Sequence, residues 1–299
     1  MKILITGANG FLGGHLLRHL KNQGFDAQGW GNEDENNTVD ITDYVSVKQA
    51  FERIRPDLIV HLAALAFVLQ KQPVEFYHVN VLGAENILNA SIEVGVAKQG
   101  LVLASTAGVY GNQPTEFLSE TSPALPVNHY SISKLSMEMI ARKYQFDRPI
   151  TIIRPFNMIG PSQSEMFVVP KIIKHYAERA DLLEIGNTSS VRDYLYVDDF
   201  NYLMESLIKK ANVGHNVVNL CTGVGHSVQD ILNMMAEISG YELPIKQVVQ
   251  HVRKDDIHRM VGCTAHMRQL LDARRDFVSL RESLQRIYSD KLAQLSTRD

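Results

Sequence analysis

Short apolar runs alternate with amphipathic segments through the first half of the chain. The runs "KILIT", "DLIVHLAA", "GLVLAS" and "ITIIRP" have the length and the sparse polar content of buried parallel strands. Four segments between them have apolar residues three and four positions apart, which predicts helices: "GGHLLRHLKNQG", "VSVKQAFERIRP", "FYHVNVLGAENILNASIEVG" and "YSISKLSMEMIARKY". This alternation predicts an α/β fold with a doubly wound parallel sheet.

The rhythm changes after residue 160. A polar loop, "PSQSEMF", precedes the helical pattern "VVPKIIKHYAERA" and then a short extended piece that leads into another helix. We therefore predict a first domain over residues 1–160 and a smaller α/β lobe over residues 161–299. The segment "HNVVNLCTG" predicts a strand near 215–222 that returns to the first sheet. "SVQDILNMMAEISG" predicts a helix capped by Ser227 and Gly240.

Composition narrows the choice of partners. The chain has 299 residues, 45% of them hydrophobic and 21% charged, with a formal net charge of -3. Because it has no long Lys/Arg run, we expect neither nucleic acid nor a membrane surface as partner. Its two cysteines rule out a disulfide framework and show no zinc-site spacing. No window approaches the ~20 apolar residues of a membrane span. We expect a cytoplasmic protein that binds small molecules and no metal.

A glycine-rich stretch, "TGANGFLGG", follows the first predicted strand and opens a helix. Its glycines fall at Gly7, Gly10 and Gly13. A tight turn, a close approach of pyrophosphate to the backbone and close helix packing each require a glycine in a dinucleotide-binding (Rossmann) domain. The spacing is a variant of the usual motif, so alone it fits a bare turn equally well.

The end of the second strand indicates which dinucleotide is bound. After "DAQGW" come Gly31, Asn32, Glu33 and Asp34, with no arginine to meet a 2'-phosphate. We therefore expect NAD(H) or NADP(H) as cofactor, and the missing arginine favours NAD(H). The two acids are nearly as well explained as part of a solvated loop.

Three side chains are candidates for chemistry. Tyr130 and Lys134 are four residues apart at the start of a predicted helix, so they share one face. A nearby ammonium is expected to lower the pKa of the phenol and make it an acid or base for a carbonyl/alcohol pair. Thr106, or less favourably Ser105, follows a buried strand and would lie at the carboxyl edge of the sheet. Either hydroxyl can hold a substrate oxygen.

With these residues in place, the sequence resembles the extended short-chain dehydrogenase/reductases that act on nucleotide-diphosphate sugars. The resemblance covers nearly the whole chain. Its motifs are "TGANGFLGG", "VDIT" after a third strand, "HLAA", "NVLGAENIL", "STAGVYG", "YSISK", "RPFNMIGP" and "VRDYLYVDD". Within the family, "RPFNMIGPSQ" and "CTGVGHSVQDIL" are most similar to the GDP-4-keto-6-deoxy-mannose reductases.

The resemblance implies roles for individual residues. Tyr130 transfers the proton, Lys134 is its partner and binds the cofactor ribose, and Thr106 binds the substrate oxygen. The residues implied at the cofactor are Gly7, Gly10, Phe11, Leu12, Gly13, Asp40, Ile41, Leu62, Ala63, Ala64 and Asn80, together with Tyr130 and Lys134. Asp40 and Ile41 would border the adenine, and Leu62 to Ala64 the nicotinamide ribose. The residues implied at the substrate are Asn157, Arg192 and Arg253, besides Thr106.

Two departures from the family pattern bear on activity. Dehydratases of the family carry an acid two positions before the tyrosine of "STAGVYG", where this chain has Gly108. Dehydration is therefore not expected. Near the C-terminus, the chain reads "LLDARRDFVSL" where relatives usually have a "GW-x-P" turn. The fold should tolerate this change, but the sugar pocket nearby is less well defined by the resemblance.

Three functions are compatible with these residues. The first is NAD(P)H-dependent reduction of the C4 keto group of a nucleotide-linked 4-keto-6-deoxy sugar, with GDP as the expected nucleotide. The second is a nucleotide-sugar 4-epimerase with tightly held NAD+. The third is a dinucleotide-sensing protein without chemistry, for which Thr106, Tyr130 and Lys134 together would be superfluous. Relatives usually dimerise through helices at 80–95 and 130–145, so we expect a homodimer.

Overall fold

The main sheet has six parallel strands. The computed structural model describes residues 1–31, 39–66, 72–210, 214–248 and 256–297. The sheet has the spatial order β2-β1-β3-β4-β5-β9, and every pair is parallel. Its strands are β1 (Lys2–Thr6), β2 (Asp26–Trp30), β3 (Leu58–His61), β4 (Gly100–Ala104), β5 (Ile150–Pro155) and β9 (Asn216–Leu220). The predicted doubly wound sheet is confirmed.

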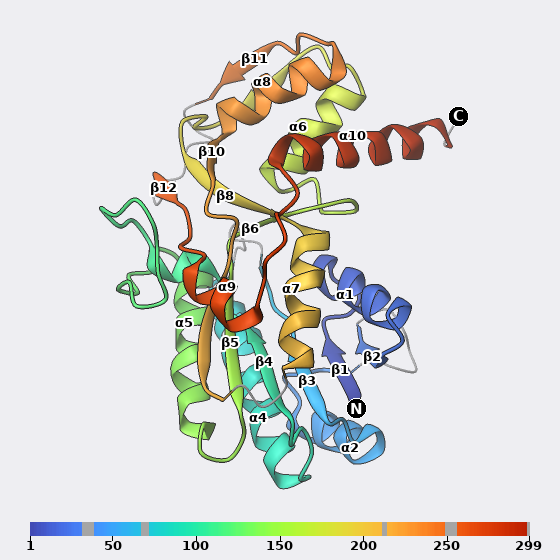
Figure 1. Cartoon of the computed structure of the whole chain (residues 1–299), viewed down its shortest axis with the longest axis vertical. Coiled ribbons are helices and arrows are strands. Elements are labelled where there is room, and N and C mark those ends of the chain that lie inside the picture. The colour runs from blue at the N-terminus through green and yellow to red at the C-terminus, as the bar shows by residue number, and fades with distance from the viewer. Residues whose placement is uncertain (32–38, 67–71, 211–213, 249–255, 298–299) are drawn as a thin grey trace.

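Helices cover both faces of this sheet (Figure 1), which is why its strands are almost continuously apolar. One face carries α2 (Tyr44–Ile54), α4 (Ala84–Glu93) and α5 (His129–Ala141). The other carries α1 (Phe11–Asn22), α7 (Val197–Lys209) and α9 (Ala265–Leu271). Alternate residues of one strand enter different cores: Ile59 packs with the first group and Leu58 and Val60 with the second.

The helix predicted over "FYHVNVLGAENILNASIEVG" is not a single α-helix. It consists of α3 (Val74–Tyr77), a π-helical segment η1 (His78–Gly83) and α4. A π-helical turn adds a residue to the helical repeat and so changes which side chain faces inward. Here the fully buried side chain is Asn80. The 3.6-residue periodicity alone does not reveal this insertion.

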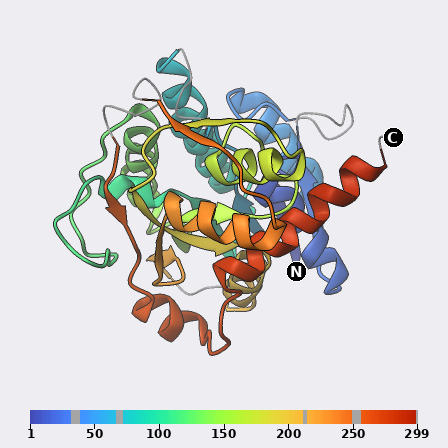
Figure 2. The same ribbon diagram turned by 90° about the horizontal axis from the view of Figure 1, so that it is seen from above.

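The second lobe lies beyond the carboxyl ends of the main strands (Figures 1 and 2); it includes β6, before residue 160, whereas α7, β9 and α9 belong to the main sheet and its helices. In its four-stranded sheet, β8 pairs with three other strands. Strand β8 comprises Val191–Tyr196, and its three partners are β6 (Asn157–Ile159), β10 (Gly225–Ser227) and β12 (Arg259–Met260). A two-stranded sheet joins β7 (Leu183–Ile185) to β11 (Ile245–Gln247). The helices are α6 (Val168–Ala177), α8 (Val228–Ser239) and α10 (Leu280–Ser296).

The predicted caps of α8 are confirmed. The Ser227 hydroxyl accepts from the Asp230 N–H at 3.0 Å, and the Asp230 carboxylate accepts from the Ser227 N–H at 2.7 Å, which completes a capping box. At the other end, Gly240 has a φ of 62°, in the left-handed region that favours glycine. Both ends were readable from sequence because caps are local structures.

The unusual C-terminal segment has a structural explanation. The buried carboxylate of Asp199 on α7 accepts from the Arg275 guanidinium at 2.5 Å and from the Val278 N–H at 2.8 Å. "LLDARRDFVSL" is thereby anchored to α7 by a charged pair rather than by a proline turn. Within the described ranges, the helices are too short or too polar to span a membrane.

Candidate active site

The glycine-rich turn joins β1 to α1 with very little space between backbones. Gly7 has a φ of 72°, and its carbonyl accepts from the Gly10 N–H at 3.0 Å. A Cβ on Gly13 would lie 2.1 Å from the Gly7 oxygen. Helix α1 begins after Gly10 with no side-chain cap and no acid in its first turn. Its first N–H groups therefore suit an anionic ligand such as a pyrophosphate.

This turn lies at the switch point of the sheet, where the strand order reverses between β1 and β3. A Cβ on Gly7 would lie 2.6 Å from the Ala63 nitrogen, so the two loops touch. The Thr6 hydroxyl fixes this contact, because it lies 2.7 Å from His61 Nδ1 and accepts from the Ala63 N–H at 3.2 Å. Leu62, Ala63 and Ala64, all half-buried, extend from this point. A ligand over the turn would therefore meet the loop after β3.

Asn80 links the loop after β3 to helix α5. Its side-chain oxygen accepts from the Leu65 N–H at 2.9 Å, and its amide donates to the Leu65 carbonyl at 3.1 Å and to the Ser133 hydroxyl at 3.0 Å. Ser133 directly precedes Lys134. Asn80 thus fixes two of the predicted site segments relative to each other, the loop after β3 and the start of α5.

Thr106 and Tyr130 meet at the carboxyl end of β4. The Thr106 side chain accepts from the Gly108 N–H at 3.1 Å and is hydrogen-bonded to Tyr130. Burial raises the pKa of Tyr130 to about 12, and the bond from Thr106 opposes that rise. The expectation that Lys134 lowers this pKa is wrong for the protein alone, because burial is the larger effect. The phenol is therefore protonated at neutral pH.

Lys134 is buried behind the pair. Its ammonium donates to the Ala104 carbonyl at 2.7 Å, and only 2% of the residue is exposed. Burial lowers the pKa of Lys134 to about 8, and the negative charge of Glu138 opposes that change. The pKa of buried His61 falls to about 3, because of burial and of the nearby Lys134 charge. His61 is therefore neutral and Lys134 is mostly protonated at neutral pH.

Gly108 is required by packing. A Cβ at this position would lie 2.4 Å from the Ser131 hydroxyl oxygen and 3.4 Å from that of Thr106. Ser131 is itself held at the start of α5, where its N–H donates to Asn128. No carboxylate fits there without displacing Ser131, which agrees with the expected lack of dehydratase chemistry.

A substitution at Gly108 tests this packing. We expect Gly108→Ala to lower kcat about tenfold, because the new methyl group must displace Ser131 or Thr106. The double variant Gly108→Ala/Ser131→Ala removes the clashing hydroxyl and should recover most of that loss. Steady-state kinetics of the three proteins measure the effect, and an unimpaired single variant would contradict the packing argument.

The residues implied at the adenine lie between β2 and α2. "VDIT" directly precedes α2 and follows β2, so its expected place after a third strand is wrong. The Asp40 carboxylate is exposed and accepts from the N–H and hydroxyl of Thr42. Ile41 is buried, and a Cβ on Gly83 would lie 2.8 Å from it. Glu33 and Asp34, on which the preference for NAD rests, lie outside the described residues.

Two of the residues implied at the substrate, Asn157 and Arg192, lie in the second lobe. Asn157 on β6 is paired with Tyr194 on β8, and both Asn157 and Arg192 are half-buried. Arg192 forms an ion pair with Asp256 at 3.1 Å. Asp256 also accepts from the Asn187 amide at 2.8 Å. Arg253 lies outside the described residues, so the predicted pair of arginines is seen only in part.

Several buried polar residues near the site were not singled out from sequence. Asp193, beside Arg192, accepts from the N–H groups of Thr222, Gly223 and Gly262 and so ties the segments after β9 and β12 to β8. Glu138 and Arg154 form an ion pair next to Lys134. A carboxylate four residues after Lys134 on the same helical face was the one available signal for Glu138.

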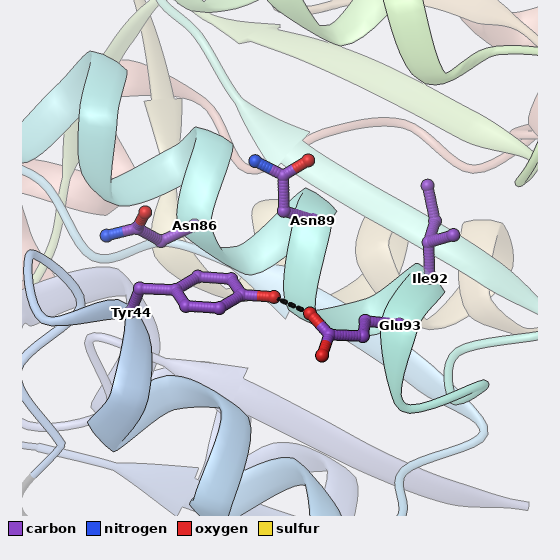
Figure 3. A pocket seen from close by; sticks show the side chains of 5 residues that line it. All are labelled: Tyr44, Asn86, Asn89, Ile92 and Glu93. Carbon is purple, nitrogen blue, oxygen red and sulfur yellow. Dashed lines mark hydrogen bonds between the residues drawn. The ribbon is translucent and has the colours of Figure 1, made fainter.

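A separate hollow of about 490 Å³ lies on the outer surface between α2 and α4 (Figure 3). Its lining residues are Tyr44, Asn86, Asn89, Ile92 and Glu93, and the Tyr44 hydroxyl donates to the Glu93 carboxylate. None of the predicted catalytic side chains lines it. In the described part of the chain, no cluster of three or more His, Cys, Asp or Glu is arranged to hold a metal ion.

Comparison with known proteins agrees with this geometry. The model of the NAD dependent epimerase/dehydratase family matches residues 3–221. The chain belongs to this family. Membership of this family confirms the expected nicotinamide dinucleotide as cofactor. The glycine turn and the uncapped start of α1 fit the pyrophosphate of such a cofactor.

Individual relatives match over almost their full lengths. GDP-6-deoxy-D-talose 4-dehydrogenase of Aggregatibacter actinomycetemcomitans is 41% identical over 99% of this chain and 100% of its own. GDP-6-deoxy-D-mannose reductase of Pseudomonas aeruginosa is 26% identical over 97% and 96%. The solved UDP-glucose 4-epimerase of Thermus thermophilus, in complex with NAD, is 28% identical, with a TM-score of 0.85 over 97% and 99%.

Proposed function

We propose that this protein is an NAD(P)H-dependent reductase of the C4 keto group of a GDP-linked 4-keto-6-deoxy sugar. The observation that carries the proposal is the contact between the side chains of Thr106 and Tyr130 at the carboxyl end of β4, where the Lys134 ammonium is buried against the Ala104 carbonyl. Two hydroxyls that converge beside a cation suit proton transfer to a carbonyl oxygen. Gly108 leaves no acid for water elimination.

Tyr130 is the proton donor in this mechanism. Its phenol is protonated at neutral pH, because burial raises the pKa to about 12. It donates its proton to the substrate oxygen as negative charge develops there. Thr106, whose oxygen already accepts from the Gly108 N–H, can turn its own proton from Tyr130 to the same substrate oxygen. Lys134 stabilises the phenolate that remains.

The cofactor's place is proposed from the glycine turn. The N–H groups around Gly10, Phe11, Leu12 and Gly13 would face the pyrophosphate, with Gly7 providing the turn. When bound, the dinucleotide exchanges a hydride with the sugar. Asp40 and Ile41 are proposed at the adenine, and Lys134 at a ribose hydroxyl. The loop 62–64 is proposed beside the nicotinamide ribose. Asn80 fixes the next residue of this loop, Leu65, by bonds to its backbone.

The sugar nucleotide would bind towards the second lobe. Arg192 presents a guanidinium that Asp256 already orients, and a guanidinium pairs well with phosphate oxygens. Asn157 and Arg253 are proposed alongside it. We therefore propose that the diphosphate binds near β6 and β8 and that the sugar extends towards Thr106.

Two relatives support the choice of sugar. One is named as a 4-dehydrogenase of GDP-6-deoxy-D-talose and the other as a GDP-6-deoxy-D-mannose reductase. Talose and mannose differ in configuration at C4, so oxidation at that carbon converts both compounds to one ketone, the 4-keto derivative of GDP-6-deoxy-D-mannose. The greater identity to the talose enzyme favours the talo product.

The test uses this ketone. Purified protein is incubated with it and either NADH or NADPH, absorbance loss is followed, and the C4 configuration of the product is read by NMR. We expect cofactor oxidation and a GDP-6-deoxy-D-talose product. dTDP-, UDP- and CDP-linked 4-keto sugars serve as comparisons. If none of these sugars is turned over, the proposal is wrong.

The 4-epimerase alternative shares the same residues and has relatives in the family. It would appear as NAD that copurifies with the protein, together with C4 inversion and no net consumption of cofactor. A dinucleotide-sensing role would appear as binding without turnover of any nucleotide sugar. A second incubation, with a GDP-linked 4-hydroxy sugar in place of the ketone and without added cofactor, therefore separates the epimerase from the other two functions.

We also propose a homodimer formed through α4 and α5. Met139 and Ile132 lie two turns apart on α5 and are 61% and 36% exposed, and Leu82 in η1 is 48% exposed. An interface formed by these two helical segments would bury these side chains. We expect Met139→Asp to elute as a monomer in size-exclusion chromatography with light scattering. Leu292→Asp on distant α10 should remain dimeric, and a wild-type monomer would contradict the proposal.

A further inference from the structure

A buried ion pair lies directly behind the catalytic residues. Arg154 at the end of β5 and Glu138 on α5 have side chains that are 6% and 3% exposed. Two parallel bonds join them, from Arg154 Nε to Glu138 Oε1 at 3.0 Å and from Nη2 to Oε2 at 2.6 Å. Burying two charges is costly unless both are well bonded, and such pairs often add little stability over apolar side chains. Stability alone therefore does not explain this pair.

Further bonds extend the pair to Ser105, Tyr110 and Asn219. On one side, the Ser105 hydroxyl, at the end of β4, donates to Glu138 Oε1 at 2.5 Å. On the other, Arg154 Nη1 donates to the Tyr110 hydroxyl at 2.9 Å, and that hydroxyl donates to Asn219 on β9 at 2.6 Å. The network thus spans the carboxyl ends of β4, β5 and β9 and reaches α5.

Two members of the network, Ser105 and Glu138, adjoin catalytic side chains. Ser105 immediately precedes Thr106. Glu138 lies one helical turn after Lys134 and two turns after Tyr130, on the same helix. The distance between the Thr106 and Tyr130 hydroxyls depends on how the end of β4 packs against α5. The bond from Ser105 to Glu138 joins these two elements directly.

We propose that Glu138 and Arg154 are positioning residues for catalysis: through Ser105 they fix the end of β4 against α5, and so hold Thr106 beside Tyr130. The proposal rests on the function proposed above. Glu138 accepts the Ser105 bond, and Arg154 holds the Glu138 carboxylate in the orientation that allows it. Neither residue contacts substrate.

The charge on Lys134 is a second consequence of the pair. Burial alone favours a neutral Lys134, and Glu138 opposes this by raising the lysine pKa. The charges that face this region are Glu138 on α5 itself and Arg154 from β5, while His61 from β3 is neutral. The carboxylate therefore helps to keep the ammonium protonated as well as oriented.

The first variant removes only the bond between Ser105, at the end of β4, and Glu138. Ser105→Ala leaves the Glu138–Arg154 pair intact, and we expect it to lower kcat about tenfold, as a small misplacement of reacting groups does. KM for the nucleotide sugar should be unchanged, because no binding group is lost. A wild-type kcat in Ser105→Ala overturns the proposal.

Two double variants separate positioning from folding. Glu138→Leu/Arg154→Met and Glu138→Gln/Arg154→Met both remove the ion pair without leaving an unpaired charge, so both should fold. Only the Gln variant keeps an acceptor for Ser105. We expect kcat to fall about tenfold in the Leu variant and distinctly less in the Gln variant. Equal losses in the two doubles would contradict the role of the Ser105 bond.

Combining the changes tests whether Ser105 acts through Glu138. In Ser105→Ala/Glu138→Leu/Arg154→Met, kcat should stay within about twofold of that of Glu138→Leu/Arg154→Met, because the shared link is already broken. Additive losses would mean that Ser105 or the pair acts by another route, and would overturn the proposal. Arg281→Met/Glu237→Gln removes an exposed ion pair between α10 and α8, outside the site, and should leave kcat unchanged.

The cycle is measured with whichever reaction the wild type catalyses, ketoreduction or epimerisation. A wild type without either activity overturns the proposed function, and this inference falls with it. An active wild type with an additive cycle overturns the inference alone.

Discussion

Replacing Tyr130 by phenylalanine is expected to lower kcat/KM about a thousandfold, within the range attributed to general acid catalysis. The variant lacks the only phenol that is bonded to Thr106 within the described structure. Its ring should remain in place, because it packs against Phe76 with ring centroids 6.0 Å apart. Stopped-flow or steady-state oxidation of the reduced dinucleotide measures the loss, and dinucleotide binding should be retained.

The matched control for this variant is Tyr77→Phe. The Tyr77 hydroxyl lies 3.0 Å from His129 Nδ1, at the first residue of α5 and next to Tyr130 in sequence. Removing it changes the same atom type at the same end of the helix, without a contact to Thr106. We expect near wild-type kinetics. Unchanged kinetics in Tyr130→Phe itself would contradict the role of Tyr130 as proton donor.

Replacing Gly13 by alanine is expected to abolish tight dinucleotide binding and to destabilise the fold. The added Cβ would lie 2.1 Å from the Gly7 oxygen, 2.7 Å from the Gly7 carbon and 2.9 Å from Ala8 Cα. All three atoms are backbone, so the turn itself must move. We expect unfolding to become easier by about 2 kcal/mol and dinucleotide affinity to fall at least about tenfold, a change of about 1.4 kcal/mol.

Gly14→Ala is the matched control in the same helical turn. Its Cβ would meet a single atom, the Ala8 oxygen, at 3.2 Å. Thermal melts and dinucleotide fluorescence titrations of both variants give the two quantities. A Gly13→Ala protein that binds the dinucleotide as tightly as the wild type would show that the turn is not the pyrophosphate site.

Much of the site was accessible from local pattern. The four-residue spacing of Tyr130 and Lys134 placed both on one face of α5, and a buried strand before Thr106 placed that residue at the carboxyl edge of the sheet. The glycine spacing indicated the β1–α1 turn. These features follow from helix periodicity, strand length and backbone sterics, which act over a few residues.

Electrostatic properties were less accessible. The proximity of Lys134 suggested a lowered pKa for Tyr130, whereas burial raises it in the structure. Sequence spacing reveals which groups are neighbours on a helix but not how much solvent each has lost. Burial is set by the elements that pack over the helix, here those around Phe76 and β4.

Long-range polar contacts were the least accessible. The bonds from Asn80 to Ser133 and from Ser105 to Glu138 join residues 53 and 33 positions apart. Asn80 also depends on the π-helical segment η1, which interrupts the periodicity that predicted one continuous helix. Neither a hydrophobic pattern nor a short motif records such pairings.

By itself, the sequence determined the alternation of strands and helices, the glycine turn, the caps of α8 and the shared face of Tyr130 and Lys134, because each depends on backbone geometry over one or two turns. Only the tertiary structure decided that Thr106 touches Tyr130, that Ser131 excludes a side chain at Gly108 and that Glu138 joins α5 to β5 through Arg154 and to β4 through Ser105. Those contacts exist because the sheet brings the carboxyl ends of distant strands to one edge and α5 packs against it, and only the folded chain sets these distances.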